Sequence, residues 1–308
     1  KLERVVAKAR GRLPALDLCM APHADKLAVA DNAVSWPTDG AASTGLRVEA
    51  GDLASIIYTS GSTGTPRGAM LTHGNICSNV AAIVQYLALT PADRVLCVLP
   101  FYYPHGKLLL HAHAAFGAIV VSEAPFQSPK VAFDTLVAEQ CTGLSGVPST
   151  FTILLERTDF ASRALPSLRY VTQAGGAMSP RTTRQLMAAL PDKQIFIMYG
   201  ATEASARLAF VPPRELATSV GAIGRPIDGV TLRVLRPDDS ECDDDEIGEL
   251  VASGPNIMQG YWNASEETAL VLGVHGYRTG DLARRDARGC YYVVGRKKDM
   301  LKVGGHRQ

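Results

Sequence analysis

One loop in the sequence combines the residue types that bind phosphate. It reads Tyr-Thr-Ser-Gly-Ser-Thr-Gly-Thr-Pro-Arg-Gly over residues 58–68 and contains Thr59, Ser60, Gly61, Ser62, Thr63, Gly64 and Arg67. Its glycines let the backbone approach a ligand closely, its hydroxyl and N–H groups donate to phosphate oxygens, and Arg67 adds a positive charge. The spacing differs from a P-loop, since no Gly-Lys-Ser/Thr follows. From composition alone, a plain surface turn is the alternative.

A second constellation pairs a hydroxyl with a carboxylate directly after an apolar segment. Tyr199-Gly200-Ala201-Thr202-Glu203 follows the apolar residues 195–198. The carboxyl ends of parallel strands border the ligand crevice, so Thr202 and Glu203 should face the same space as the loop. A carboxylate beside bound phosphates is the hard oxygen ligand that Mg²⁺ needs. Taken alone, the pair is also typical of a helix N-terminus with Thr202 as its cap.

Three weaker motifs accompany these two. They are Gln-Ala-Gly-Gly-Ala at 173–177, Thr-Gly-Asp at 279–281 and Gly-Arg-Lys-Lys-Asp at 295–299. Each has a plain interpretation by itself: a strand-to-helix turn, a turn with an Asx hydrogen bond, and solvated basic surface. Their value lies in their order along the chain.

Taken together, the motifs resemble those of the adenylate-forming superfamily, which contains acyl- and aryl-CoA synthetases, adenylation domains of peptide synthetases and luciferases. The resemblance runs from about Gly51 to Gln308. It implies that a carboxylic acid and Mg·ATP form an acyl-adenylate and pyrophosphate. A thiol, either CoA or the phosphopantetheine of an acyl carrier protein, then forms a thioester.

The resemblance also implies roles for single residues. The loop would close over the β- and γ-phosphates. Arg67 stands where the family usually has Lys, so a planar guanidinium replaces a compact ammonium group. Within the motif that includes Gly200, Tyr199 would border the adenine, Thr202 would contact the α-phosphate and Glu203 would hold Mg²⁺. The catalytic candidates are thus Thr202, Glu203 and Arg67.

The weaker motifs gain nucleoside-binding roles in the same way. Gly175, Gly176 and Ala177 would let the adenine and the acyl group approach the backbone. Asp281 would accept hydrogen bonds from both ribose hydroxyls, and Arg296 would contact the ribose. The aspartate at the end of the last motif, Asp299, would be the hinge to a small C-terminal domain.

The acid is expected to bind near an aromatic segment that precedes a helix-like pattern. The candidate lining residues are Tyr102, Tyr103, His105, Gly106 and Val147. Many relatives have His where this chain has Tyr103, so the pattern departs here. Aromatic packing, with His105 bonded to backbone, is the alternative. The set lacks an acidic partner for a buried ammonium group, which favours a fatty or aryl acid over an amino acid. His111 and His113 are interpreted as structural.

Composition narrows the class of partner. The 308 residues are 46% hydrophobic with a net charge of +1, which gives no electrostatic reason to expect nucleic acid or a membrane surface. No apolar run approaches the ~18 residues of a membrane span, and no signal-peptide core is evident. A small-molecule partner and a cytoplasmic location are therefore expected.

Alternating strand and helix patterns predict an α/β fold with a largely parallel sheet covered by helices, and the loop is placed at a strand-to-helix turn. Short strands then predict a β-rich, barrel-like subdomain. The expected divisions are 1–224, 225–298 and a hinge at 299–308. The acidic run 238–246 is interpreted as a solvated hairpin tip, with a calcium loop as the lesser alternative.

The family's early strands and its C-terminal domain, which carries a lysine that promotes adenylation, are expected to be missing from this chain. We therefore expect the chain to bind nucleotide better than it turns over. An amino-acid adenylation domain and a catalytically silent adenylate-binding module remain alternatives. A P-loop or kinase-like phosphotransferase is disfavoured because the sequence lacks both signature motifs.

Overall fold

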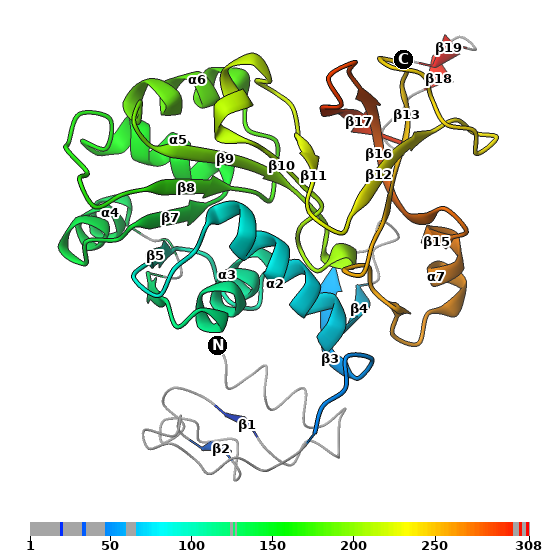
Figure 1. Cartoon of the computed structure of the whole chain (residues 1–308), viewed down its shortest axis with the longest axis horizontal. Coiled ribbons are helices and arrows are strands. Elements are labelled where there is room, and N and C mark those ends of the chain that lie inside the picture. The colour runs from blue at the N-terminus through cyan, green and yellow to red at the C-terminus, as the bar shows by residue number, and fades with distance from the viewer. Residues whose placement is uncertain are drawn as a thin grey trace. The chain divides into compact units, whose positions relative to one another are not determined.

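The structure, a computed structural model, describes residues 47–59, 66–123, 126 and 128–297, and the backbone of four two-residue strands outside these ranges. The chain divides into two units, Lys1–Val48 and Glu49–Gln308. In the first unit, β1 (Cys19–Met20) pairs in parallel with β2 (Ala33–Val34). All the predicted site residues fall in the second unit (Figure 1).

A seven-stranded sheet forms the centre of the α/β part, in the order β11-β10-β9-β8-β7-β5-β6. Its strands are β5 (Arg94–Cys97), β6 (Ile119–Ser122), β7 (Gly143–Gly146), β8 (Tyr170–Gln173), β9 (Gln194–Tyr199), β10 (Ala209–Val211) and β11 (Arg225–Pro226). From β6 to β9 all neighbours are parallel, whereas β10 and β11 are antiparallel. The predicted α/β fold with a largely parallel sheet is confirmed.

Helices cover both faces of this sheet (Figure 1). They are α2 (His73–Leu87), α3 (Pro104–Ala115), α4 (Pro129–Ala138), α5 (Pro148–Arg157) and α6 (Pro180–Ala189). Successive side chains of a strand point to opposite faces. Val171 of β8 accordingly packs with the residues of α4, α5 and α6, while its neighbour Tyr170 packs with those of α2 and α3.

A small antiparallel sheet corrects one prediction. β4 (Arg67–Thr72) pairs with β3 (Leu53–Thr59), and β14 (Gly260–Tyr261) pairs with β4. The predicted phosphate-binding loop therefore connects the two strands of a β-hairpin, and its placement at a strand-to-helix turn is wrong. Ala69 and Leu71 are buried at a spacing of two, which is the period of a strand. The helix begins only after Thr72, whose side chain caps it.

A second antiparallel sheet makes up most of the β-rich part. It contains β12 (Thr231–Leu235), β13 (Gly248–Ser253), β15 (Leu272–Gly273), β16 (Gly276–Arg285) and β17 (Tyr291–Arg296). Its order is β12-β13-β16-β15, with β17 also paired to β16. The remaining elements are the 3₁₀ helices η2 (Thr202–Ala204) and η3 (Pro213–Thr218), the helix α7 (Ser265–Val271), and the strands β18 (Lys302–Val303) and β19 (His306–Arg307).

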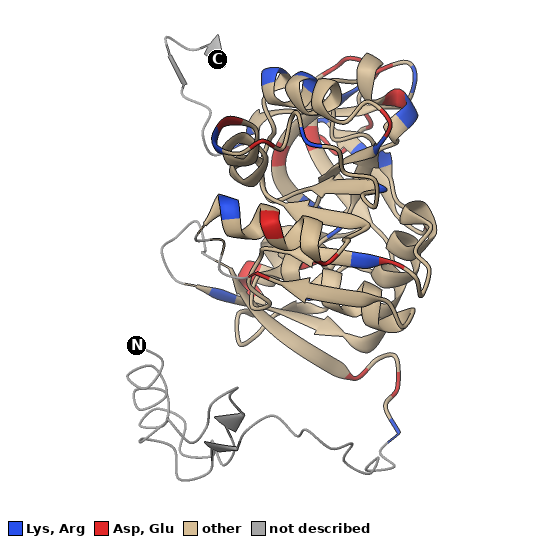
Figure 2. Ribbon diagram, turned by 90° about the vertical axis from the view of Figure 1, so that its left-hand side faces the viewer, with Lys and Arg blue, Asp and Glu red and all other residues tan. Residues whose placement is uncertain are grey.

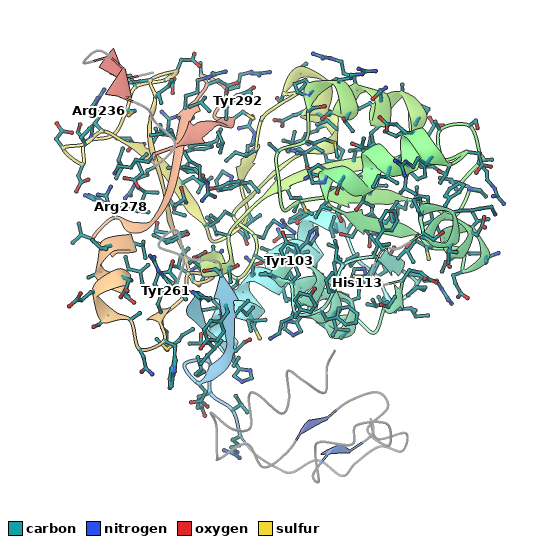
Figure 3. The ribbon with its side chains drawn as sticks, turned by 180° about the vertical axis from the view of Figure 1, so that it is seen from behind. Tyr103, His113, Arg236, Tyr261, Arg278 and Tyr292 are labelled. Carbon is teal, nitrogen blue, oxygen red and sulfur yellow. The ribbon has the colours of Figure 1, made fainter. Side chains whose placement is uncertain are left out.

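The acidic run between β12 and β13 is paired with arginines. Asp239 pairs with Arg278, and Asp244 pairs with Arg285 at 2.9 Å. Arg236 pairs with Asp243 at 3.0 Å and also with Glu246. Both Arg236 and Arg278 are labelled in Figure 3. Exposed pairs of this kind contribute little, about 0–1 kcal/mol each.

Figure 2 shows Lys and Arg mixed with Asp and Glu along the ribbon on the face it presents. Among the described helices, none combines the length and the apolar character that crossing a lipid bilayer requires.

Candidate active site

Three predicted nucleoside-binding residues meet between β9 of the seven-stranded sheet and the strands β16 and β17 of the β-rich part. Asp281 of β16 is 5% exposed. Its Oδ2 accepts a hydrogen bond from the hydroxyl of Tyr199 at 2.5 Å, and its Oδ1 lies 2.8 Å from Nε of Arg296. The strands explain the contact, because Asp281 and Arg296 are directly opposite each other in the β16–β17 pair. Tyr199 arrives from the end of β9.

This arrangement keeps the carboxylate ready to accept further bonds. Burial and then the negative charge of Asp281 raise the pKa of Tyr199 well above its ordinary value, so the phenol stays a neutral donor. Each carboxylate oxygen has two lone pairs, and the contacts with Tyr199 and Arg296 use one on each. The fixed carboxylate can therefore still accept hydrogen bonds from vicinal hydroxyls.

Glu203 is held by a tyrosine that the sequence analysis missed. Its Oε1 accepts a hydrogen bond from the hydroxyl of Tyr261 at 2.7 Å, and its carbonyl accepts one from the N–H of Met258 at 2.8 Å. The guanidinium of Arg67 lies 5.5 Å from the centre of the Tyr261 ring. Tyr261, labelled in Figure 3, thus stands between a carboxylate and a cation that both have predicted phosphate-site roles.

No local signal in the sequence points to Tyr261. It enters the site because β14 pairs with β4, which places Tyr261 opposite Ala69. Burial and then the charge of Glu203 raise the pKa of Tyr261 and also that of Tyr277. Both phenols are therefore neutral at pH 7.

The residues present fit a magnesium site of the kind completed by phosphates. Mg²⁺ is commonly bound through one or two carboxylates plus substrate phosphates and waters. Glu203 is half-buried and oriented by Tyr261, whose strand β14 pairs with β4, the strand that follows the loop. Among the described residues, no group of three or more His, Cys, Asp or Glu could hold a metal ion.

The loop itself falls mostly outside the described residues. Ser60, Gly61, Ser62, Thr63 and Gly64 are not described, nor is the hinge candidate Asp299. The two ends of the loop are described: Thr59 ends β3 and is paired with Arg67 at the start of β4.

Thr202 begins the short helix η2 and is half-buried. The N-cap of η2 is Ala201, which makes no side-chain cap bond, so the alternative of Thr202 as a cap is wrong. Gly200 leaves room for the turn that follows, since a Cβ there would lie 2.1 Å from the carbonyl oxygen of Ala206.

Some of the residues predicted for the acid pocket converge around Gly175. A Cβ at this glycine would lie 2.4 Å from the hydroxyl of Tyr103 and 3.2 Å from a methyl group of Val147. Its φ of +84° also favours glycine. Gly176 and Ala177, beside it, are exposed. The carboxyl ends of β7 and β8 thus meet the start of α3 here.

Other candidates are placed differently. Tyr102 is 85% exposed. Gly106 is packed against backbone, since a Cβ there would lie 2.5 Å from the carbonyl oxygen of Pro100. His105 is buried, and its Nε2 lies 3.0 Å from Oγ of Ser145, so the alternative of a backbone partner is wrong. Burial and then the charge of Arg207 lower its pKa well below 6.5, which leaves it neutral at pH 7.

The interpretation of His113 as structural agrees with its contacts. Its Nδ1 lies 2.8 Å from the carbonyl oxygen of Leu109, one turn earlier on α3, and its Nε2 lies 3.0 Å from the hydroxyl of Tyr170. In Figure 3, the labelled His113 lies apart from Tyr261.

Comparisons with known proteins point to one family. The profile of the family described as AMP-binding enzyme matches residues 4–262. An indoleacetate–CoA ligase from Aromatoleum aromaticum is 33% identical over 252 residues, covering 81% of this chain and 49% of that protein. A feruloyl-CoA synthase from an Amycolatopsis species is 32% identical over 307 residues, covering 98% of this chain and 58% of that protein.

A solved structure resembles the fold as well. The O-succinylbenzoate coenzyme A synthetase of Bacillus subtilis, in complex with ATP and magnesium ion, superposes with a TM-score of 0.79 at 26% identity, covering 88% of this chain and 56% of that one. The chain spans about half the length of the curated relatives that it matches.

Proposed function

This chain belongs to the family of AMP-binding enzymes, within the adenylate-forming superfamily, and we propose that it is the nucleotide- and acid-binding part of an AMP-forming acid–thiol ligase. In the proposed reaction, a carboxylate oxygen attacks the α-phosphorus of ATP and the bond to the β-phosphate breaks, releasing pyrophosphate. A thiol sulfur then attacks the acyl carbon, and AMP leaves. The thiol we favour is CoA, with a carrier-protein phosphopantetheine as the alternative.

One observation carries this proposal: Asp281 is held jointly by Tyr199 and Arg296, three residues from three separate motifs. A buried, oriented carboxylate flanked by a neutral phenol and a cation suits the two hydroxyls of a ribose. In this scheme Tyr199 borders the adenine and Arg296 holds the Asp281 carboxylate in place.

The phosphate end of the site uses Glu203, Thr202 and Arg67. Because phosphoryl transfer depends on positioning and on charge stabilisation, their work is to align the α-phosphate and to offset the charge of the leaving group. Mg²⁺, when bound by Glu203, supplies part of that charge. Tyr261, whose strand β14 pairs with β4, orients the Glu203 carboxylate through its hydrogen bond.

For the acid, we propose an aryl or fatty acid bound beside Tyr103, Val147 and Gly175. The side chains of Tyr103 and Val147 both lie where an added Cβ at Gly175 would meet them, which supports this placement. Two relatives support an aryl acid, since one is an indoleacetate–CoA ligase and the other a feruloyl-CoA synthase.

Calorimetric titration with a non-hydrolysable acyl-adenylate analogue tests the proposal, with Mg·ATP as a second ligand. We measure binding rather than turnover because the chain spans about half the length of the relatives that it matches. We expect saturable binding that Asp281→Ala weakens about 10- to 100-fold, since a charged hydrogen-bond partner contributes about 1.5–3 kcal/mol.

Asp192→Ala is the matched control, because Asp192 is exposed in the turn between α6 and β9. It should bind like the unmodified chain. Equal binding by Asp281→Ala, or no binding by a folded unmodified chain, would contradict the proposed nucleoside site.

A further inference from the structure

Arg207 is a buried cation beside the residues proposed to bind the acid. The residue is only 2% exposed. Its charge acts on His105 and on Tyr103, and the hydroxyl of Tyr86 lies within hydrogen-bonding reach of its guanidinium. The guanidinium is therefore enclosed between α2, which carries Tyr86, and the start of α3.

The described residues supply no negative charge to balance it. None of their Asp or Glu side chains forms an ion pair with Arg207, and its Nε has no hydrogen-bond partner among them. Tyr86 is neutral at pH 7, because burial raises its pKa. His105 is neutral as well. A guanidinium stays charged in proteins, and an unpaired buried charge costs several kcal/mol.

The two residues before Arg207 have strained backbone torsion angles, and these set the direction in which the chain enters Arg207. Ser205 and Ala206 have φ values of 52° and 81°, in the left-handed region that non-glycine residues rarely adopt. Such residues are strained and persist only where the surroundings hold them. Here the surroundings do so: the side-chain amides of Asn79 and Asn256 each donate to the carbonyl oxygen of Arg207 at 2.8 Å.

This turn directly follows Glu203, so the element that carries the proposed magnesium ligand also presents Arg207. The two ends of one short segment would then serve the two substrates of the proposed reaction, with Glu203 toward the phosphates of ATP and Arg207 toward the acid.

We propose that Arg207 binds a second anionic group on the acid, a carboxylate or sulfonate remote from the carboxyl group that is activated. This inference rests on the proposed function and deepens it by naming the substrate class. A guanidinium is planar and forms two parallel hydrogen bonds with such a group, which gives both charge compensation and orientation. The hydroxyl of Tyr86, which donates to Sδ of Met198 at 3.1 Å, also interacts with the guanidinium.

The test compares matched pairs of acyl-sulfamoyl-adenosine analogues by calorimetry. In each pair the acyl group ends in a carboxylate or in the corresponding neutral amide, using succinyl, glutaryl and 4-carboxybenzoyl groups. A 3-sulfopropanoyl analogue distinguishes sulfonate from carboxylate. AMP alone reports on the nucleoside site independently of the acyl part.

We expect the charged member of at least one pair to bind about tenfold more tightly or better, a difference of about 1.4 kcal/mol. Arg207→Met should abolish the preference while AMP still binds, and Arg207→Lys should retain part of it. Arg214→Met is the control, since the Arg214 side chain is 86% exposed.

If AMP binds but charged and neutral analogues bind equally in every pair, the inference about Arg207 is overturned and the nucleoside site stands. If the folded chain binds neither AMP nor any analogue, the proposed function fails and this inference fails with it. The unmodified chain alone decides between these outcomes, so the test holds even if Arg207→Met does not fold.

Discussion

Tyr261 connects the two charged groups that we place at the phosphates. Its hydroxyl donates to Oε1 of Glu203 at 2.7 Å, and the guanidinium of Arg67 lies 5.5 Å from the centre of its ring. The hydroxyl also interacts with Arg67, so it links both charged groups, while the ring contacts Arg67 alone. Removing the hydroxyl therefore frees the carboxylate while the ring keeps one contact with the cation.

We expect Tyr261→Phe to weaken binding of Mg·ATP about fivefold, since one hydrogen bond contributes about 1 kcal/mol. The ring remains, so its cation–π contact with Arg67 remains, while the hydroxyl's interactions with Glu203 and Arg67 are both lost. The measurement is the apparent Kd for ATP over a series of magnesium concentrations, where the variant should need more magnesium to reach half-saturation.

Tyr292→Phe is the control, because the Tyr292 hydroxyl contacts Asp286 and Arg288 outside this site. An identical magnesium dependence for Tyr261→Phe and the unmodified chain would show that Tyr261 does not orient Glu203.

Local patterns were sufficient to predict most of the elements, because the strands β5 to β9 are short apolar runs between helices with clear periodicity. β4 was missed because its six residues run directly into α2, and Thr72 both ends the strand and caps the helix. Without that strand, the loop was assigned to the wrong kind of turn.

The site was predicted less completely, for reasons of distance along the chain. Tyr199 and Asp281 were found only through their resemblance to family motifs, whereas Glu203 also followed from its position after an apolar strand. Tyr261 depends on the pairing of β14 with β4, and no short-range pattern reports such a pairing. Arg207 had a signal, a single charge within the apolar run 204–211, but the sequence does not show whether such a charge is solvated or enclosed.

The segment from β9 through η2 depends on the small size of Gly200. We expect Gly200→Ala to lower the free energy of unfolding by about 1–3 kcal/mol, the usual cost of overpacking, because its Cβ would lie 2.1 Å from the carbonyl oxygen of Ala206. The displaced turn also carries Arg207, so any preference for charged acyl groups should fall in parallel.

Urea unfolding measures the first effect and the analogue titration measures the second. Gly273→Ala is the control, since a Cβ at Gly273 would meet no atom within 4 Å. A fully stable Gly200→Ala variant would show that the turn rearranges without cost, and would contradict the account of how Arg207 is positioned.

A single buried carboxylate joins four segments of the α/β part. Asp93 accepts bonds from Arg169, with both Oδ1 and Oδ2 at 2.9 Å from Nη2, and from Thr142 at 2.8 Å. It also caps the turn at Thr90. Arg169 in turn donates to the carbonyl oxygen of Leu87 at 2.8 Å, so the end of α2 is tied to the starts of β5, β7 and β8.

These contacts make the stability of the protein depend on pH in one direction. Burial by itself would raise the pKa of Asp93, but the hydrogen bonds from Thr142, Thr90 and Arg169 together lower it. A carboxyl group with a lowered pKa stabilises the folded state above its unfolded value of about 3.9, and this contribution disappears as the pH falls through the folded value. We therefore expect Asp93→Asn to cost about 2 kcal/mol at pH 7, within the range for hydrogen bonds to a charged group.

That difference between Asp93→Asn and the unmodified chain should shrink as the pH falls below about 4, because the unmodified chain then loses the same charge. Urea unfolding at pH 7, 5 and 3.5 follows the change. Asp134→Asn serves as the control, since Asp134 is half exposed and paired with the exposed Lys130, and its effect should stay small throughout. A constant difference at all three pH values would mean that shape, rather than the charge of Asp93, holds the four segments together.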